Sequence, residues 1–485
     1  MQYTRFPLKA REGALVQEQP MAVVAEEYAG DLAPKALVEP VRLHLMPTIL
    51  MLSIVMPIII NLAGLTLTSS RIVLVLTFIP VFVFWITGKA GRIRVADIMV
   101  VSCAAWTVIA LLAVEGLARV NYAGIVAIEM LCPYLIARCY IRGEADYAAL
   151  MRFFRWIAIF LAPAAMVEAL TTKRLYVMLL DPVFHVLAKA PYEFRMGMSR
   201  AQVVFEHPIL YGVYVATFCA PVYMVARAQG RSPFKSLIFV SPVVIATFFS
   251  LSTGAYLGLI MQMLFIAWAF IFQTNPKRWI ILTALVALAY VVVSLLSNRT
   301  PFEVFISYLT FNSSTSYMRV LIFTFGMENV WINPLFGMGL GEWVRPSWMY
   351  ASSVDNFWLV MAMRYGIPAF VLIALAYATT FATMMRARPA STAAGLYRDG
   401  HVFSLIGLAT AMCTVHLWTA SFVFMMFMLG AGLWVADAPQ ENCKDKGLGK
   451  AVDGLKPRAP DGASGGSRSS DQTRRSAPRL PSVRP

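Results

Sequence analysis

The chain has 485 residues, of which 59% are hydrophobic and 14% charged, and its formal net charge is +15. Because about a quarter of the residues in an ordinary soluble domain are charged, this composition excludes that class and predicts an integral membrane protein. Basic cytoplasmic loops explain a positive net charge in a membrane protein, so no nucleic-acid partner is expected.

Polar residues dominate 1–45, and we predict a cytoplasmic N-terminal tail there. The membrane domain is predicted at 46–437, and it contains about twelve apolar stretches of spanning length. These are 46–67, 72–88, 98–116, 122–140, 153–170, 208–227, 235–251, 254–273, 279–297, 356–385, 402–418 and 420–436. The stretch 356–385 is too long for one straight helix, so a re-entrant or interfacial start is expected. Residues 438–485 are predicted to be a disordered basic cytoplasmic tail, rich in Lys, Arg, Gly, Ser and Pro.

The predicted fold class is therefore all-α, a polytopic membrane protein with about twelve transmembrane helices. The short loops near 90, 142, 230, 277 and 390 are consistently basic, which predicts that both termini are cytoplasmic. Two long loops, near 171–207 and 298–355, then face outward. Connections of that length are unusual unless they carry function, and we expect short helices in them.

Cysteines and histidines give no sign of a metal or disulfide framework. The six cysteines form no CxxC pair and the five histidines are scattered singly. This pattern favours buried thiols and argues against a metal cluster, so no cofactor is expected.

Two arginines in the outer loops, Arg200 and Arg319, are candidates for binding phosphate. The planar, permanently charged guanidinium group matches pairs of phosphate oxygens. Arg319 is expected in the first turn of a helix capped within 314–316, where backbone amides also favour an anion. The alternative is that each arginine reaches toward lipid headgroups.

A second group of candidates follows Arg319. The glycines of "GMGLG" (337–341) predict a close backbone turn that either is purely structural or offers amides to an oxyanion. Asp355 lies at the outer end of the stretch 356–385, where it either caps the helix or acts as a base. Arg364 and Glu129 lie within apolar stretches, where a charged group needs a partner or a water-filled cavity.

These motifs together resemble those of the O-antigen ligase and polymerase superfamily, which transfers glycans from polyprenyl diphosphate. The first motif is matched by Arg200, Ala201, Phe205, His207 and Pro208. The second is matched by Arg319, Asn333, Pro334, Leu335, Phe336, Gly337 and Gly339. The third is matched by Asp355, Asn356, Trp358 and Leu359, with Gly366 and Ile367 beyond. The resemblance covers about 200 to 386.

The resemblance implies an inverting, metal-independent glycosyltransferase in the bacterial inner membrane, with the outer loops in the periplasm. It implies a polyprenyl-diphosphate-linked oligosaccharide as substrate, and flippase and chain-length or export proteins as pathway partners. Arg200 and Arg319 would hold the diphosphate. Asp355, or else His207 or Glu206, would assist the attacking hydroxyl. The further substrate-binding candidates are Gly337, Gly339, Asn356, Arg364 and Arg345.

Two departures from the family pattern bear on the reaction. Ligase-type members carry a histidine where this chain has Asp355, and many relatives have Ser-Arg-Gly where it has Ser252-Thr253-Gly254. Both favour a polymerase of the exopolysaccharide or capsule type over a ligase that transfers the glycan to another acceptor. A transporter or lipid flippase is the alternative from a different class.

Overall fold

The computed structural model describes residues 42–62, 65–187, 189–298, 301, 304, 313–349 and 353–437. The predicted tails, apart from residues 42–45, lie outside this part of the chain. The described residues are mainly helical. The helices before the first long loop are α2 (Leu45–Ile54), α3 (Ser69–Ile86), α4 (Val95–Glu115), η1 (Leu117–Arg119), α5 (Val120–Tyr140) and α6 (Glu144–Thr171). Those of the middle are α7 (Leu175–Leu180), α8 (Pro208–Ala216), α9 (Cys219–Ala228), α10 (Pro233–Phe248), α11 (Thr253–Ile271) and α12 (Arg278–Leu296).

The last helices are α14 (Ser313–Ile332), α15 (Phe357–Arg386), α16 (Thr392–Met412), α17 (Thr419–Ala431) and α18 (Trp434–Asp437). Two antiparallel hairpins complete the described elements: β1 (Ile59–Leu62) with β2 (Leu65–Thr68), and β3 (Phe194–Arg195) with β4 (Met198–Ser199). Nine helices of the described part are long and apolar enough to cross a membrane, and α2 and α10 are shorter apolar helices. The chain is an all-α polytopic membrane protein, as predicted.

The first predicted span, 46–67, is wrong in its second half. α2 ends at Ile54, and the chain then forms the β1–β2 hairpin. Pro57 has no amide hydrogen with which to continue a helix. Its carbonyl accepts from the Leu187 amide at 2.8 Å, while the Ile59 amide donates to the His185 carbonyl at 2.8 Å. The hairpin is therefore hydrogen-bonded to the first long loop. Its apolar residues form strands and do not continue a membrane-spanning helix.

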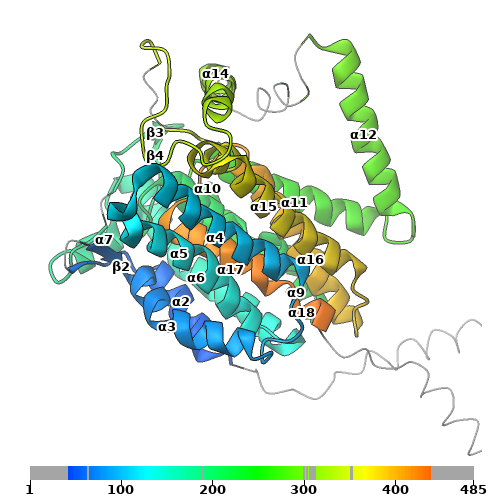
Figure 1. Cartoon of the computed structure of the whole chain (residues 1–485). Helices are drawn as coiled ribbons and strands as arrows, with labels where there is room; N and C mark the ends of the chain where they lie inside the picture. The colour runs from blue at the N-terminus through cyan, green and yellow to red at the C-terminus, as the bar shows by residue number, and fades with distance from the viewer. Residues whose placement is uncertain are drawn as a thin grey trace, which may run out of the picture. The chain divides into compact units, whose positions relative to one another are not determined.

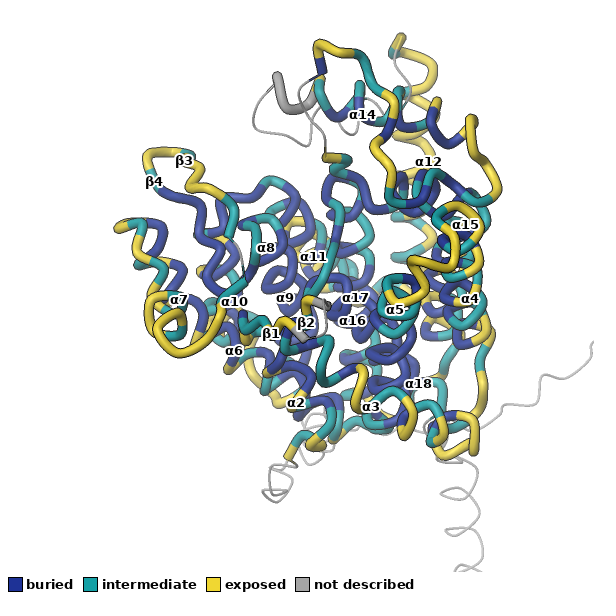
Figure 2. The backbone as a smooth tube through the Cα atoms, turned by 60° about the vertical axis from the view of Figure 1, so that its left-hand side comes forward, coloured by how far each residue is buried: buried dark blue, intermediate teal, exposed yellow. Residues whose placement is uncertain are grey.

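The interior of the bundle is built around α17, whose residues Ser421–Ala431 are all buried (Figures 1 and 2). α5 packs on α17, α15 on α4, and α16 on both α9 and α11. Small residues permit these close approaches, as is common between membrane helices. A Cβ on Gly407 would lie 2.6 Å from the Gly258 carbonyl oxygen, and one on Gly430 would lie 2.6 Å from the Tyr134 carbonyl oxygen.

One end of the bundle gathers the two long loops. α8, α15 and α17 begin there and α10 ends there, since the Ala201 amide donates to the Phe249 carbonyl at 3.0 Å and the Phe357 amide to the Val415 carbonyl at 3.1 Å. Figure 1 shows α14 and the β3–β4 hairpin at this same end. Among the described residues, the second long loop contains α14, a helix of 20 residues, and the first contains the short helix α7 of 6 residues. The short basic loops between α3 and α4, α5 and α6, and α9 and α10 lie at the opposite end.

Candidate active site

Arg200 is fixed where the β3–β4 hairpin returns to the bundle. Its amide donates to the Glu193 carbonyl at 2.9 Å, and the next amide, that of Ala201, is bound to the Phe249 carbonyl. The Arg200 side chain is 2% exposed, and its Nη1 donates to Glu193 Oε2. Its Nε and Nη2 have no hydrogen-bond partner among the described residues. Burial lowers the pKa of this guanidinium, but arginine remains protonated at neutral pH, so the site holds a cation with spare donors.

Arg319 has the same character. It lies in the second turn of α14, because the helix already begins at Ser313; the predicted first-turn position next to a cap within 314–316 is therefore wrong. Apolar contacts hold α14 on α15, and at Gly326 the fit is so close that a Cβ would lie 2.6 Å from Leu359 Cδ2. Arg319 is 9% exposed, and its Nε and Nη1 have no partner within the described part of the chain.

The glycine segment after α14 forms a turn whose backbone amides donate hydrogen bonds to other groups of the protein. The Gly337 amide donates to the Asn333 carbonyl at 3.0 Å and the Gly339 amide to the Arg364 carbonyl at 3.1 Å. The Leu340 amide donates to Glu115 Oε1 at 2.7 Å. These amides are therefore engaged, and the predicted role of Gly337 and Gly339 as amide donors to an oxyanion is wrong.

Asp355 and Asn356 have separate roles at the start of α15. Asn356 is the N-cap, and its Oδ1 accepts from the Leu359 amide at 3.1 Å, so the cap is not Asp355. Burial raises the pKa of the Asp355 carboxyl, while the charge of Arg319 lowers it. Asp355 is thus a half-buried carboxyl group facing the cation of α14.

His207 and Glu206, which precede α8, differ in what they can do. Glu206 Oε2 accepts from Trp418 Nε1 and from Thr419 Oγ1, so Glu206 is a structural acceptor. His207 Nδ1 accepts from the Ile209 amide at 3.2 Å. With that nitrogen occupied, the neutral ring carries its hydrogen on Nε2 and is a donor, which argues against His207 as the base.

A cavity of about 620 Å³ joins these side chains. Its ionisable lining consists of five arginines, three carboxylates and two histidines: Arg195, Arg200, Arg319, Arg345, Arg364, Glu193, Glu342, Asp355, His207 and His416. The cations outnumber the carboxylates, so the cavity favours an anion. Among the described residues, no group of three or more His, Cys, Asp or Glu side chains is arranged to hold a metal ion.

The structure brings together most of the predicted site but not all of it. Gly337, Gly339, Asn356 and Glu206 do not line this cavity. Glu129 is paired instead with Arg71, whose Nε lies 2.6 Å from its Oε1.

Sequence reasoning missed Arg195, His416 and Trp418. Arg195 lies in the same outer loop as Arg200, so the criterion that selected Arg200 would also have selected it. His416 and Trp418 were counted within a predicted span, 402–418, whereas α16 ends at Met412.

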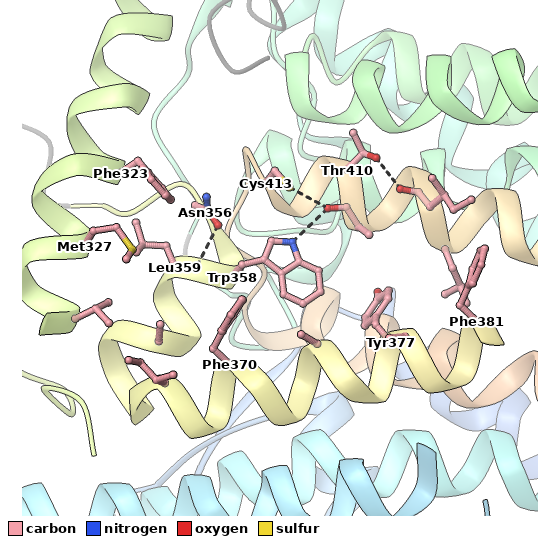
Figure 3. Close-up of a pocket in the computed structure, with 18 of the residues that line it drawn as sticks. Phe323, Met327, Asn356, Trp358, Leu359, Phe370, Tyr377, Phe381, Thr410 and Cys413 are labelled. Carbon is pink, nitrogen blue, oxygen red and sulfur yellow. Dashed lines mark hydrogen bonds between the residues drawn. The ribbon is translucent and has the colours of Figure 1, made fainter. Parts of the chain in front are cut away.

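An apolar groove of about 910 Å³ lies beside the cavity, between α14, α15 and α16 (Figure 3). Trp358, Phe370, Tyr377 and Phe381 line it along α15. The start of α15 separates the two spaces, since Asn356, Leu359 and Ala362 line the groove whereas Asp355, Val360 and Met363 line the cavity. A ligand with a charged head and a long apolar chain has room for both parts here.

The fold and the cavity define a polytopic membrane protein with an arginine-rich cavity beside an apolar groove. Residues 237–374 match the family model described as O-antigen ligase, so the resemblance to the O-antigen ligase and polymerase superfamily is confirmed over this segment. The segment includes Arg319, Asp355 and Arg364. The family implies a glycan-transferring enzyme of ligase or polymerase type in surface glycan synthesis, acting on a lipid-linked glycan. No curated protein matches the sequence.

Proposed function

We propose that the protein polymerises polyprenyl-diphosphate-linked oligosaccharide repeat units into a surface polysaccharide. The observation that supports this most is the pair of buried guanidinium groups of Arg200 and Arg319, which line the same cavity as Asp355. Each has two nitrogens without a hydrogen-bond partner among the residues that the structure describes. Buried polar groups normally have partners, so charged donors left free toward a cavity favour an anionic ligand there.

In this proposal the diphosphate of the donor binds to Arg200 and Arg319, and the polyprenyl chain lies in the apolar groove. The groove's walls are almost entirely hydrocarbon and aromatic, which suits an isoprenoid. Arg364 and Arg345 line the same cavity and add positive charge around the glycan-diphosphate junction.

The acceptor is a sugar hydroxyl of the next lipid-linked repeat unit. Its oxygen attacks the anomeric carbon of the donor sugar from the face opposite the diphosphate, while Asp355 takes the hydroxyl proton. The bond between the anomeric carbon and the phosphate oxygen breaks, and its electron pair leaves with the polyprenyl diphosphate. Because the attack comes from the opposite face, the configuration of the anomeric carbon is inverted. The fixed guanidinium groups stabilise the charge that grows on the leaving oxygen, and they do so without a metal.

The basic loops at the opposite end of the bundle support an orientation with the cavity in the periplasm and both termini in the cytoplasm of the inner membrane. On the periplasmic side, a flippase of the same pathway would supply the substrate, and chain-length or export proteins would receive the product.

The test is the glycan profile of a strain that lacks this protein, complemented with the wild type or with Arg319→Ala. Loss of long polymer with single repeat units retained on lipid supports the polymerase. Full-length polymer that fails to reach its final acceptor would instead identify a ligase, the function that a histidine at 355 would have favoured. Repeat units that never leave the cytoplasmic face would identify a transporter.

A further inference from the structure

A row of rings crosses one wall of the polar cavity and has no role in the bond-breaking step. His207, Trp418 and His416 all line the cavity. The ring centroids of His207 and Trp418 are 6.1 Å apart, and those of Trp418 and His416 are 5.8 Å apart. Phe357 continues the row behind His416, with its ring 6.3 Å away and inclined by only 21°.

The indole of Trp418, the middle ring of this row, is fixed by a hydrogen bond from its N–H group. Trp418 Nε1 donates to Glu206, and Thr419, whose φ is 45°, fixes the adjoining turn and donates its hydroxyl to the same carboxylate at 3.3 Å. The segment is also tied to α15 by the hydrogen bond from the Phe357 amide to the Val415 carbonyl. Since its polar edge is engaged, the indole presents its apolar surface to the cavity.

Polar groups lie around this apolar surface. His416 Nδ1 is buried without a hydrogen-bond partner among the described residues. Burial lowers the pKa of the His416 imidazole to about 3, so at neutral pH the ring is uncharged and accepts a hydrogen bond. The arginines and carboxylates of the cavity lining add further donors and acceptors.

This combination matches the chemistry of a sugar ring, which has a face of C–H groups and an edge of hydroxyls. A row of rings that served packing alone would have both faces covered, whereas Trp418 and His416 are half-buried and open to the cavity. Resting on the proposed function, we propose that Trp418, flanked by His207 and His416, is a stacking subsite for a pyranose ring of the lipid-linked glycan. The ring packs on the indole, and one of its hydroxyls donates to His416 Nδ1.

The experiment measures binding of a soluble oligosaccharide, released by mild acid from the host's lipid-linked repeat units, to the full-length protein in nanodiscs. Saturation-transfer NMR compares the wild type with Trp418→Ala and Trp418→Phe. Stacking on a ring contributes enough that Trp418→Ala should weaken binding about three- to tenfold, while Trp418→Phe, which keeps a ring, should stay within about twofold of the wild type. Trp156→Ala, which removes a tryptophan that is 64% exposed on α6, is the matched control and should bind as the wild type does.

Equal binding by Trp418→Ala and the wild type would overturn the subsite. A loss of binding in Trp418→Phe as large as in Trp418→Ala would overturn it too, because the hydrogen bond to Glu206, and not the ring, would then be the important feature. His416→Ala provides a second measurement if Trp418→Ala does not fold, and it should weaken binding without abolishing it; unchanged binding would count against the hydroxyl contact. The probe carries no diphosphate and needs no turnover. A wild-type protein that polymerises but does not bind the oligosaccharide would refute the subsite alone, whereas stacking without polymerisation would refute the proposed function alone.

Discussion

Gly366 touches the backbone of Leu335 so closely that no other residue fits. A Cβ at Gly366 would lie 1.9 Å from the Leu335 carbonyl oxygen, and the residue has φ 83° and ψ 169° in the middle of α15. The neighbouring Ile367 amide donates to the Pro334 carbonyl at 2.8 Å. The break in α15 and the turn after α14 are therefore one joint, which sets Arg364 against the polar cavity.

We predict that Gly366→Ala disrupts this joint. The substitution forces a side chain into a positive-φ, extended-ψ conformation that is essentially restricted to glycine, which costs about 1–3 kcal/mol, and it adds a collision with the backbone of Leu335. Thermal unfolding in detergent should show a clear loss of stability, accompanied by loss of polymerisation. Gly124→Ala in α5 is the control, because a Cβ there meets nothing within 4 Å. Wild-type stability in Gly366→Ala would mean that the joint is less rigid than this contact implies.

The orientation of the bundle predicts a labelling pattern. In a variant without native cysteines, Lys173→Cys and Ser353→Cys place exposed thiols at the end with the cavity, and Arg92→Cys places one at the opposite end. Because the basic loops are expected in the cytoplasm, an impermeant thiol reagent should label the first two in intact spheroplasts and the third only after lysis. The reverse pattern would invert the protein and move the cavity to the cytoplasmic face.

The helices could be predicted from the sequence because apolar length alone marks a span, and each predicted stretch contains a helix. The hairpin at Ile59–Thr68 could not, since its residues are as apolar as those of a helix and the segment that it contacts, near His185, is distant in sequence. The break in α15 was partly predictable, because a 30-residue helix exceeds the bilayer. Its position at Gly366 depends on the contact with Leu335, which no local pattern reveals.

The residues of the candidate site were also only partly predictable from the sequence. Arg200, Arg319 and Asp355 were found because charged residues are rare in this chain and lie near predicted span ends. The glycines at 337 and 339 were assigned to ligand binding because a sequence cannot show that their amides already have partners. His416 and Trp418 were missed since they belong to an irregular segment between α16 and α17, which hydropathy merges with the spans.

Arg200 and Arg319, whose guanidinium groups keep free donor nitrogens among the described residues, give a prediction about rate. Replacing Arg319 or Arg200 with Ala removes a donor from a preorganised site, so polymer formation from purified lipid-linked repeat units should fall about a hundredfold or more. Lys should rescue each only in part, because a point charge cannot contact two oxygens as the planar fork does. Arg119→Ala, at an exposed position in η1, is the matched control. If an arginine only reaches toward lipid headgroups, its Lys variant should have full wild-type activity. Undiminished activity in Arg319→Ala would show that Arg319 is not part of the site.

Asp355 gives a prediction about pH. As the base, its carboxyl must be ionised, so kcat/KM should fall as the pH drops through its pKa, which burial raises above the ordinary value of an aspartate. The charge of Arg319 lowers the pKa of Asp355, so Arg319→Ala should move the acid limb of the profile to higher pH, while Arg319→Lys should leave it close to the wild-type position. Asp355→Asn should lower the rate by about two to four orders of magnitude and abolish the limb. If the limb instead survives in Asp355→Asn and vanishes in His207→Gln, the proton goes to the imidazole, and the hydrogen bond from the Ile209 amide to His207 Nδ1 must open during the reaction.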